Sequence, residues 1–172
     1  SKTWFVTGAS SGFGRELAAL LLQRGDRVAA TVRKADALQD LAAEHGERLW
    51  VAILDVTDGA GVRKVIDRAF AELRRIDVVV SNAGYALLGA AEEVGDAQIE
   101  RQIDTNLLGS IQVARAAIPH LRQQGGGRII QISSSVGQAA YPTLGVYAAT
   151  KWGVEGFFEG TIPEVAPFGI EV

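Results

Sequence analysis

The chain has 172 residues, 48% of them hydrophobic and 22% charged, proportions typical of one globular domain with a core of its own. The net charge of −3, without a basic run, argues against nucleic acid as a partner, and no apolar stretch is long enough to span a bilayer. The absence of cysteine excludes disulfides, thiolate metal sites and a cysteine nucleophile. With no signal peptide visible, we expect a cytoplasmic protein that binds no membrane.

The first predicted element is a short apolar strand, Trp4–Val6, followed by a glycine-rich turn and an amphipathic helix over Phe13–Arg24. Glycines allow a tight bend and a close approach of backbone to ligand, and the free N–H groups at the start of a helix attract phosphate. A tight turn also needs glycine for steric reasons alone, so the position between strand and helix is what favours a phosphate site. The candidate residues are Gly8, Ser10, Ser11, Gly12, Phe13 and Gly14.

Strands and helices alternate along the rest of the chain. Further strands are expected at 27–32, 49–54, 77–81, 128–132 and 169–172, and helices at 35–44, 58–73, 96–118 and from about 147. Pro119 is expected to end the third of these helices, and Pro163 to end or kink the fourth near Thr161, because an interior proline removes a hydrogen bond. The alternation predicts an α/β fold, a doubly wound parallel sheet with helices on both faces, in one domain over residues 1–172.

The end of the second strand indicates which dinucleotide the site would bind. Sites that prefer NAD carry an acid about 20 residues past the glycine loop, where it binds the ribose 2′-hydroxyl. Here the strand runs into Arg33 and Lys34 without such an acid, and a guanidinium binds a 2′-phosphate with paired hydrogen bonds. We therefore favour NADP(H), with Ser10 as a second candidate for the phosphate. The alternative is that Arg33 and Lys34 only begin a solvated helix.

A second group of candidate residues lies toward the end of the chain. Tyr147 and Lys151 are four positions apart and share one face of the predicted helix. A free tyrosine has a pKa of roughly 10, and a neighbouring ammonium favours the phenolate, so the pair can act as a general acid or base near neutral pH. Ser134, at a strand end, could hold a substrate oxygen against Tyr147. Taken alone, a surface tyrosine–lysine pair is the commoner interpretation of this spacing.

Taken together, these segments resemble the short-chain dehydrogenase/reductase family along the whole chain. The thirteen positions from Ser134 to Tyr147 match the spacing in that family and select Ser134 among three adjacent serines. The motifs that carry the resemblance, in family order, are Thr7-Gly-Ala-Ser-Ser-Gly-Phe-Gly14, Asp55-Val-Thr57, Asn82-Ala-Gly84, Asn106-Leu-Leu-Gly109, Ser133-Ser134 and Tyr147-Ala-Ala-Thr-Lys151.

The resemblance implies a Rossmann fold and an NADP(H)-dependent oxidoreductase that interconverts a ketone or aldehyde and an alcohol. Tyr147 would be the proton donor in reduction, Lys151 would assist it and bind the nicotinamide ribose, and Ser134 would polarise the carbonyl. Asn106 would hold a water that links Lys151 to solvent. The remaining residues implied to bind the cofactor are Asp55 and Val56 at the adenine, Arg33 at the 2′-phosphate, and Asn82, Ala83 and Gly84 beneath the ribose.

The chain also departs from the family pattern. Phe13 stands where the family usually has isoleucine, and family members continue past Val172, so the C-terminal part of the fold is expected to be missing here. The alternative function is a regulatory protein that binds NADP(H) without turnover, against which the complete set of catalytic motifs argues. The residues expected to flank the pocket suggest a largely apolar small-molecule substrate: Tyr85, Leu87, Gln138, Tyr141 and Leu144.

The remaining expectations concern aromatic and histidine residues outside the motifs. Trp152 follows Lys151 and is expected either to face a second subunit or to pack in the core, since the family commonly forms homodimers or homotetramers through this helix. His45 and His120 lie in polar surroundings near helix ends and are expected at the surface rather than as metal ligands.

Overall fold

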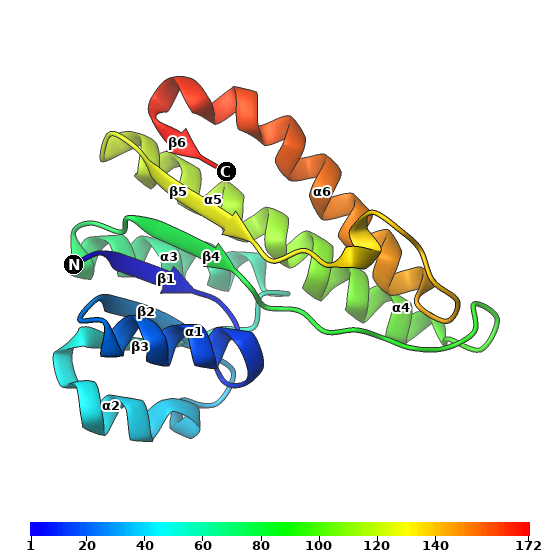
Figure 1. Ribbon diagram of the computed structural model, residues 1–172, viewed down its shortest axis with the longest axis horizontal. Helices are drawn as coiled ribbons and strands as arrows, with labels where there is room; N and C mark the ends of the chain where they lie inside the picture. The colour runs from blue at the N-terminus through cyan, green and yellow to red at the C-terminus, as the bar shows by residue number, and fades with distance from the viewer.

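Six short strands form one parallel sheet in the computed structural model, which describes residues 1–172 (Figure 1). Their order is β3-β2-β1-β4-β5-β6, so successive strands are added first on one side of β1 and then on the other. This order confirms the predicted doubly wound sheet, and ligands of such sheets bind where the order reverses, between β1 and β4. The strands are β1 (Thr3–Val6), β2 (Arg27–Val32), β3 (Leu49–Ile53), β4 (Val78–Ser81), β5 (Gly127–Gln131) and β6 (Ile170–Glu171).

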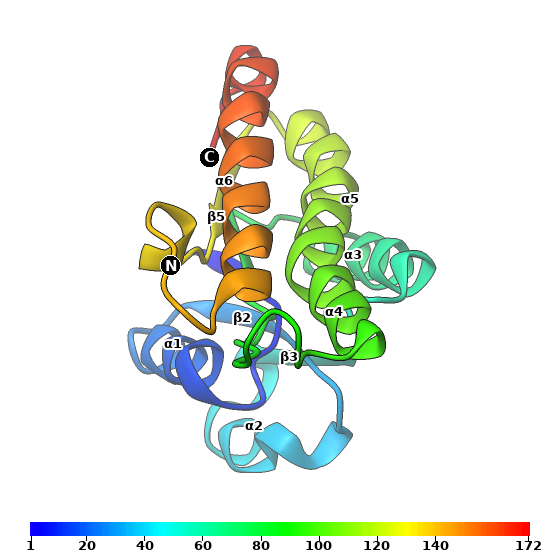
Figure 2. The same cartoon turned by 90° about the vertical axis from the view of Figure 1, so that its right-hand side faces the viewer.

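Helices cover both faces of the sheet and bury a separate apolar cluster on each. On one face α1 (Gly12–Gln23) and α2 (Gln39–His45) pack against alternate residues of the strands. On the other face α3 (Gly59–Leu73), α5 (Gly109–Gln123) and α6 (Gly145–Val165) bury the larger cluster. Figure 2 shows α3, α5 and α6 packed next to one another in that order. Because both faces are covered, the strands are apolar without alternation, as in Val78-Val79-Val80.

The shorter elements connect these helices and strands. Three-ten turns lie at Ala35–Leu38, Gly46–Arg48, Ser135–Gly137 and Ala166–Phe168. A helix α4 (Asp96–Ile103) continues through a π-helical turn, Asp104–Leu108, directly into α5. Gly25, with φ +90°, follows the C-terminus of α1, and the Asp58 carboxylate accepts hydrogen bonds from Ala60 N and Gly61 N at the start of α3.

Neither helical proline ends its helix as predicted. Helix α5 passes through Pro119 and ends at Gln123, and α6 passes Thr161 and Pro163 and ends at Val165. Each proline lies on an exposed face, as does the residue four positions before it, so water can hydrogen-bond the carbonyl that loses its partner. Meanwhile the buried faces of both helices, which include Leu121 and Val165, keep their packing against the sheet.

Three smaller expectations also differ from the structure. The helix predicted over 35–44 is a three-ten turn followed by α2. His45 is buried rather than at the surface, and Arg48 shares a hydrogen bond with its ring nitrogen at 3.3 Å. Trp152 is not a core residue, because more than half of its surface is exposed while its indole N–H donates to Val136 O at 2.8 Å. A contact of Trp152 with a second subunit stays a prediction.

Candidate functional site

A cavity of about 600 Å³ opens at the carboxyl ends of the central strands. Residues that directly follow β1, β2, β3, β4 and β5 all contribute to its lining, together with two residues from the first turns of α6. Segments distant in the sequence therefore meet at one edge of the sheet. The residues predicted from sequence that line this cavity are Gly8, Ser10, Ser11, Gly12, Phe13, Arg33, Asp55, Val56, Asn82, Ala83, Gly84, Tyr147 and Lys151.

The glycine-rich turn after β1 is shaped by close backbone contacts that exclude side chains. A Cβ on Gly8, which has φ +67°, would lie 2.8 Å from Ala83 Cα, and a Cβ on Gly14 would lie 2.5 Å from Gly8 O. Gly12, with φ +56°, instead faces open space on the cavity side. The first turn of α1 carries no acidic residue and its N-cap Ser11 makes no side-chain cap, so its backbone N–H groups are available to an anion.

Asn82 and Thr7 join the glycine turn to the end of β4. The Asn82 amide donates to Thr7 O at 2.9 Å and to Gly8 O at 3.2 Å. The Thr7 hydroxyl accepts the backbone N–H groups of Asn82 at 2.9 Å and Ala83 at 3.1 Å. These bonds hold the two loops on either side of the topological switch point at a fixed separation. The shape of the cavity floor is thus set before any ligand binds.

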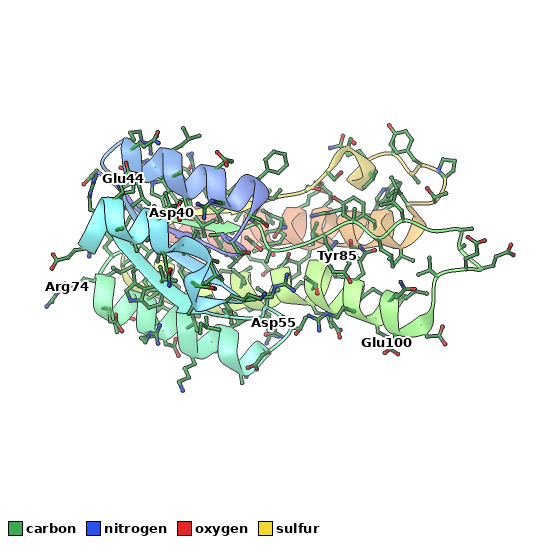
Figure 3. The ribbon with its side chains drawn as sticks, turned by 90° about the horizontal axis from the view of Figure 1, so that it is seen from below. Asp40, Glu44, Asp55, Arg74, Tyr85 and Glu100 are labelled. Atoms are coloured by element: carbon green, nitrogen blue, oxygen red, sulfur yellow. The ribbon has the colours of Figure 1, made fainter.

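Asp55, which follows β3, also lines the cavity and is the centre of a small polar network. Its carboxylate accepts from Thr57 N at 3.0 Å, from Thr57 Oγ1 at 2.8 Å and from Arg101 at 3.1 Å. Burial alone raises the pKa of Asp55, but the Thr57 hydrogen bonds and the Arg101 charge outweigh it and hold the pKa below its ordinary value. Figure 3 labels Asp55 and Tyr85, which both lie toward the middle of the molecule in that view.

Tyr147 and Lys151, one turn apart on α6, both line the cavity. Lys151 is 5% exposed, and its Nζ donates to Ile132 O at 2.8 Å and lies 5.7 Å from the centroid of the Tyr147 ring. Burial lowers the pKa of the Lys151 ammonium, and the charge of Glu155 opposes part of that shift. The structure therefore brings a phenol and an ammonium next to the end of β5, in the same cavity as the glycine turn.

Three predicted residues do not line the cavity itself. Gly14 lies behind the glycine turn, and Ser134 caps the three-ten turn after β5, where its hydroxyl accepts from Val136 N at 3.4 Å. Asn106 is buried in the π-helical turn: its side chain accepts from Tyr85 N at 3.0 Å and donates to Tyr85 O at 2.8 Å and to Thr150 Oγ1 at 3.3 Å. Asn106 thus ties the loop after β4 to α6.

Sequence reasoning did not identify several other lining residues. Arg101 and Thr105 stand one helical turn apart on α4 and the following π-helical turn and reach the cavity beside Asp55. Their i, i+4 spacing indicates only that they share one helix face, and no motif in the sequence shows that this face turns toward the cavity. Of the residues expected to flank a substrate pocket only Tyr85 lines this cavity, whereas Leu87, Gln138, Tyr141 and Leu144 lie outside its lining.

Two classes of feature are absent from the structure. No group of three or more histidine, cysteine, aspartate or glutamate side chains is arranged to hold a metal ion. None of the helices combines the length and apolar character that crossing a membrane requires.

The fold and the cavity define a class of protein. Its members have an open parallel α/β sheet and, where the strand order reverses, a glycine-rich turn that suits a phosphate group. The chain belongs to the short-chain dehydrogenase family, whose model matches residues 2–172. It is 41% identical over 173 residues to Oxidoreductase BOA17 of Botryotinia fuckeliana, covering 100% of this chain and 63% of that protein. The family is one of oxidoreductases and adopts the Rossmann-like fold described above.

Solved structures agree with this assignment. A short-chain dehydrogenase from Streptomyces avermitilis superimposes with a TM-score of 0.96 at 41% identity, over 100% of this chain and 64% of that one. The protein ElxO, solved with NADP bound, superimposes with a TM-score of 0.94 at 29% identity, over 99% of this chain and 71% of that one. The chain spans about 60% of the length of curated relatives that it matches.

Proposed function

We propose that the protein is an NADP(H)-dependent oxidoreductase that interconverts a ketone or aldehyde and the corresponding alcohol. The observation that carries the proposal is that Tyr147 and Lys151 line the same cavity as the glycine turn. A non-catalytic NADP(H)-binding regulator would need the glycine turn but not a buried ammonium beside a phenol. The bound NADP in ElxO and the absence of an acid at the end of β2 support the choice of dinucleotide.

The residues present fit a dinucleotide. The open space at Gly12 and the unpaired N–H groups at the start of α1 suit a pyrophosphate, and the guanidinium of Arg33 suits a 2′-phosphate. Asp55 and Val56 would contact the adenine, and the segment 82–84 would lie along the ribose. When bound, NADPH supplies the hydride, and the protein provides placement and proton transfer.

Each catalytic side chain has a distinct task in this proposal. Tyr147 donates its phenolic proton to the carbonyl oxygen in reduction, or accepts the alcohol proton in the reverse direction. The Lys151 ammonium stabilises the phenolate left behind, and its burial strengthens that electrostatic effect. The Ser134 hydroxyl accepts a hydrogen bond from Val136 N, which leaves its proton free for the substrate oxygen. Asn106 fixes the loop at Tyr85 and holds the water that links Lys151 to solvent.

The test is turnover by the purified protein with a panel of ketones and aldehydes, followed by the loss of reduced-cofactor absorbance. In the variant Tyr147→Phe we expect NADPH binding to persist while turnover falls by roughly 10²-fold or more, the usual value of positioned proton transfer. Full turnover in this variant would refute the role of Tyr147. Tight NADPH binding by the wild-type protein without turnover of any compound would favour the regulatory alternative.

We also propose that the substrate is a small, largely apolar carbonyl or alcohol.

We further propose that the protein forms a homodimer or homotetramer. Trp152 on α6 is exposed, and so is Leu108 on the π-helical turn before α5. Helix α6 and this π-helical turn pack against each other. Sedimentation equilibrium of the wild type and of Trp152→Arg tests the proposed oligomer, since the variant is expected to dissociate.

A further inference from the structure

The charges around the cavity are unequal. Four charged residues line it, namely Arg33, Arg101 and Lys151, which are cationic, and Asp55, which is the only acid. A dinucleotide with a 2′-phosphate and a pyrophosphate is strongly anionic. An uncompensated carboxylate in the same cavity would repel it, because charges in a partly desolvated cleft interact more strongly than in bulk water.

The contacts of Asp55 show how its charge is compensated. Thr57 occupies one carboxylate oxygen with two hydrogen bonds, and the Arg101 guanidinium binds the other oxygen at 3.1 Å. A carboxylate has about four lone-pair sites, so these three bonds leave one acceptor site on the oxygen that Arg101 shares. Arg101 comes from α4, 46 residues further along the chain than Asp55, which follows β3.

The pair is accessible to a ligand. The side chains of Arg101 and Asp55 are 53% and 39% exposed, and both belong to the cavity lining. Exposed ion pairs contribute little to folding stability. The main effect of this pair is therefore expected on ligand binding rather than on the fold.

We propose that Arg101 is a positioning residue for the dinucleotide: its guanidinium fixes the Asp55 carboxylate and cancels its charge. The carboxylate can then accept a hydrogen bond from the adenine amine without repelling the phosphates. This inference rests on the proposed function, because it assumes that the cavity receives a dinucleotide. It assigns to Arg101 a role that acts through Asp55 and not through a contact of its own with a phosphate.

The test compares the affinities of NADPH and NADH, measured by calorimetric titration, in wild-type protein, Arg101→Met and the double variant Asp55→Asn/Arg101→Met. We expect Arg101→Met to weaken NADPH binding by roughly two- to five-fold, the scale of an exposed charge pair, and NADH binding by less because NADH lacks the 2′-phosphate. In the double variant most of the loss of NADPH affinity is expected to be recovered, since the asparagine carries no charge to repel the phosphates.

The matched control is Arg75→Met. Arg75 pairs with Asp77 at 2.7 Å and is 57% exposed, but it precedes β4 at the opposite edge of the sheet, so its loss should leave both affinities unchanged. Equal losses for NADPH and NADH, or no recovery in the double variant, would show that Arg101 acts directly or only structurally and would overturn the inference. If the wild-type protein bound neither dinucleotide, the proposed function itself would fail. The variants test only the role of Arg101, so the two failures can be told apart.

Discussion

Lys151 is a buried cation in the folded protein, with 5% of its surface exposed. Burial disfavours its charged state and lowers its pKa in the folded protein, so the unfolded chain binds more protons between the folded-state pKa and the ordinary lysine value of about 10.4. The contribution of Lys151 to the free energy of unfolding is therefore least favourable below its folded-state pKa. It becomes more favourable as the pH rises from that pKa to the ordinary lysine value.

The direction of this pH dependence can be tested by removing the Lys151 charge. Lys151→Met removes the buried charge, so we expect the variant to be more stable than the wild type at neutral pH and the difference to shrink as the pH approaches about 10.4. Urea unfolding at a series of pH values measures the difference. Lys64→Met, at an exposed position on α3, is the control and should show no such trend. A difference that stayed constant or widened with pH would contradict the assignment.

Ser134 and Ser133 show what a motif cannot predict about single residues. The family spacing selects Ser134, yet Ser133 lines the cavity, and the Ser133 hydroxyl is buried without a hydrogen-bond partner. Which of two adjacent residues reaches a cavity depends on how the chain leaves β5, here through a three-ten turn capped by Ser134 itself. That local geometry follows from tertiary packing and not from residue type.

At the scale of an element, the glycine turn and α6 use glycine for opposite reasons. A Cβ on Gly14 would lie 2.5 Å from both Gly8 O and the Asn82 amide, so neither a backbone atom nor a hydrogen-bonded side chain can easily give way. We expect Gly14→Ala to destabilise the protein by about 1–3 kcal/mol, the usual effect of overpacking. Gly156 lies within α6 with open space around it, and Gly156→Ala should stabilise by up to about 1 kcal/mol.

Denaturant unfolding of the two variants measures both effects. The opposite signs make each variant the control for the other, because both replace a helical glycine by the residue with the highest helix propensity. Stabilisation by Gly14→Ala would mean that the turn relaxes freely. In that case close packing of the turn against the segment after β4 would not define the cavity floor.

The elements also show how far sequence reasoning extends. The boundaries of every strand agree with prediction to within about two residues, because each strand contains an apolar stretch bounded by polar or glycine residues. The helix ends predicted at Pro119 and near Thr161 are wrong, because at Pro119 and Pro163 the exposed side of the helix tolerates a lost hydrogen bond. The role of Arg101 was missed because α4 carries no motif, and only the fold brings it next to Asp55.

At the scale of the whole molecule, the parallel arrangement concentrates the cavity at one edge of the sheet. Five successive strands deliver their following loops to that edge, whereas the loops that precede β2, β4 and β5 lie at the opposite edge. Segments from Gly8 to Lys151 can therefore contact one ligand although they are far apart in the sequence. No single element carries the site, so a ligand that fills it should couple all of these segments.

This coupling gives a prediction for NADPH binding as a whole. At a concentration 100 times its dissociation constant, NADPH should stabilise the folded state by about 2.7 kcal/mol, and amide hydrogen exchange should slow simultaneously at 8–14, 82–84 and 147–151. The loop at 125–127, on the opposite edge, serves as the internal control and should gain only the protection that global stabilisation confers. Protection confined to the glycine turn would mean that the ligand contacts α1 alone and that Tyr147 and Lys151 do not share its site.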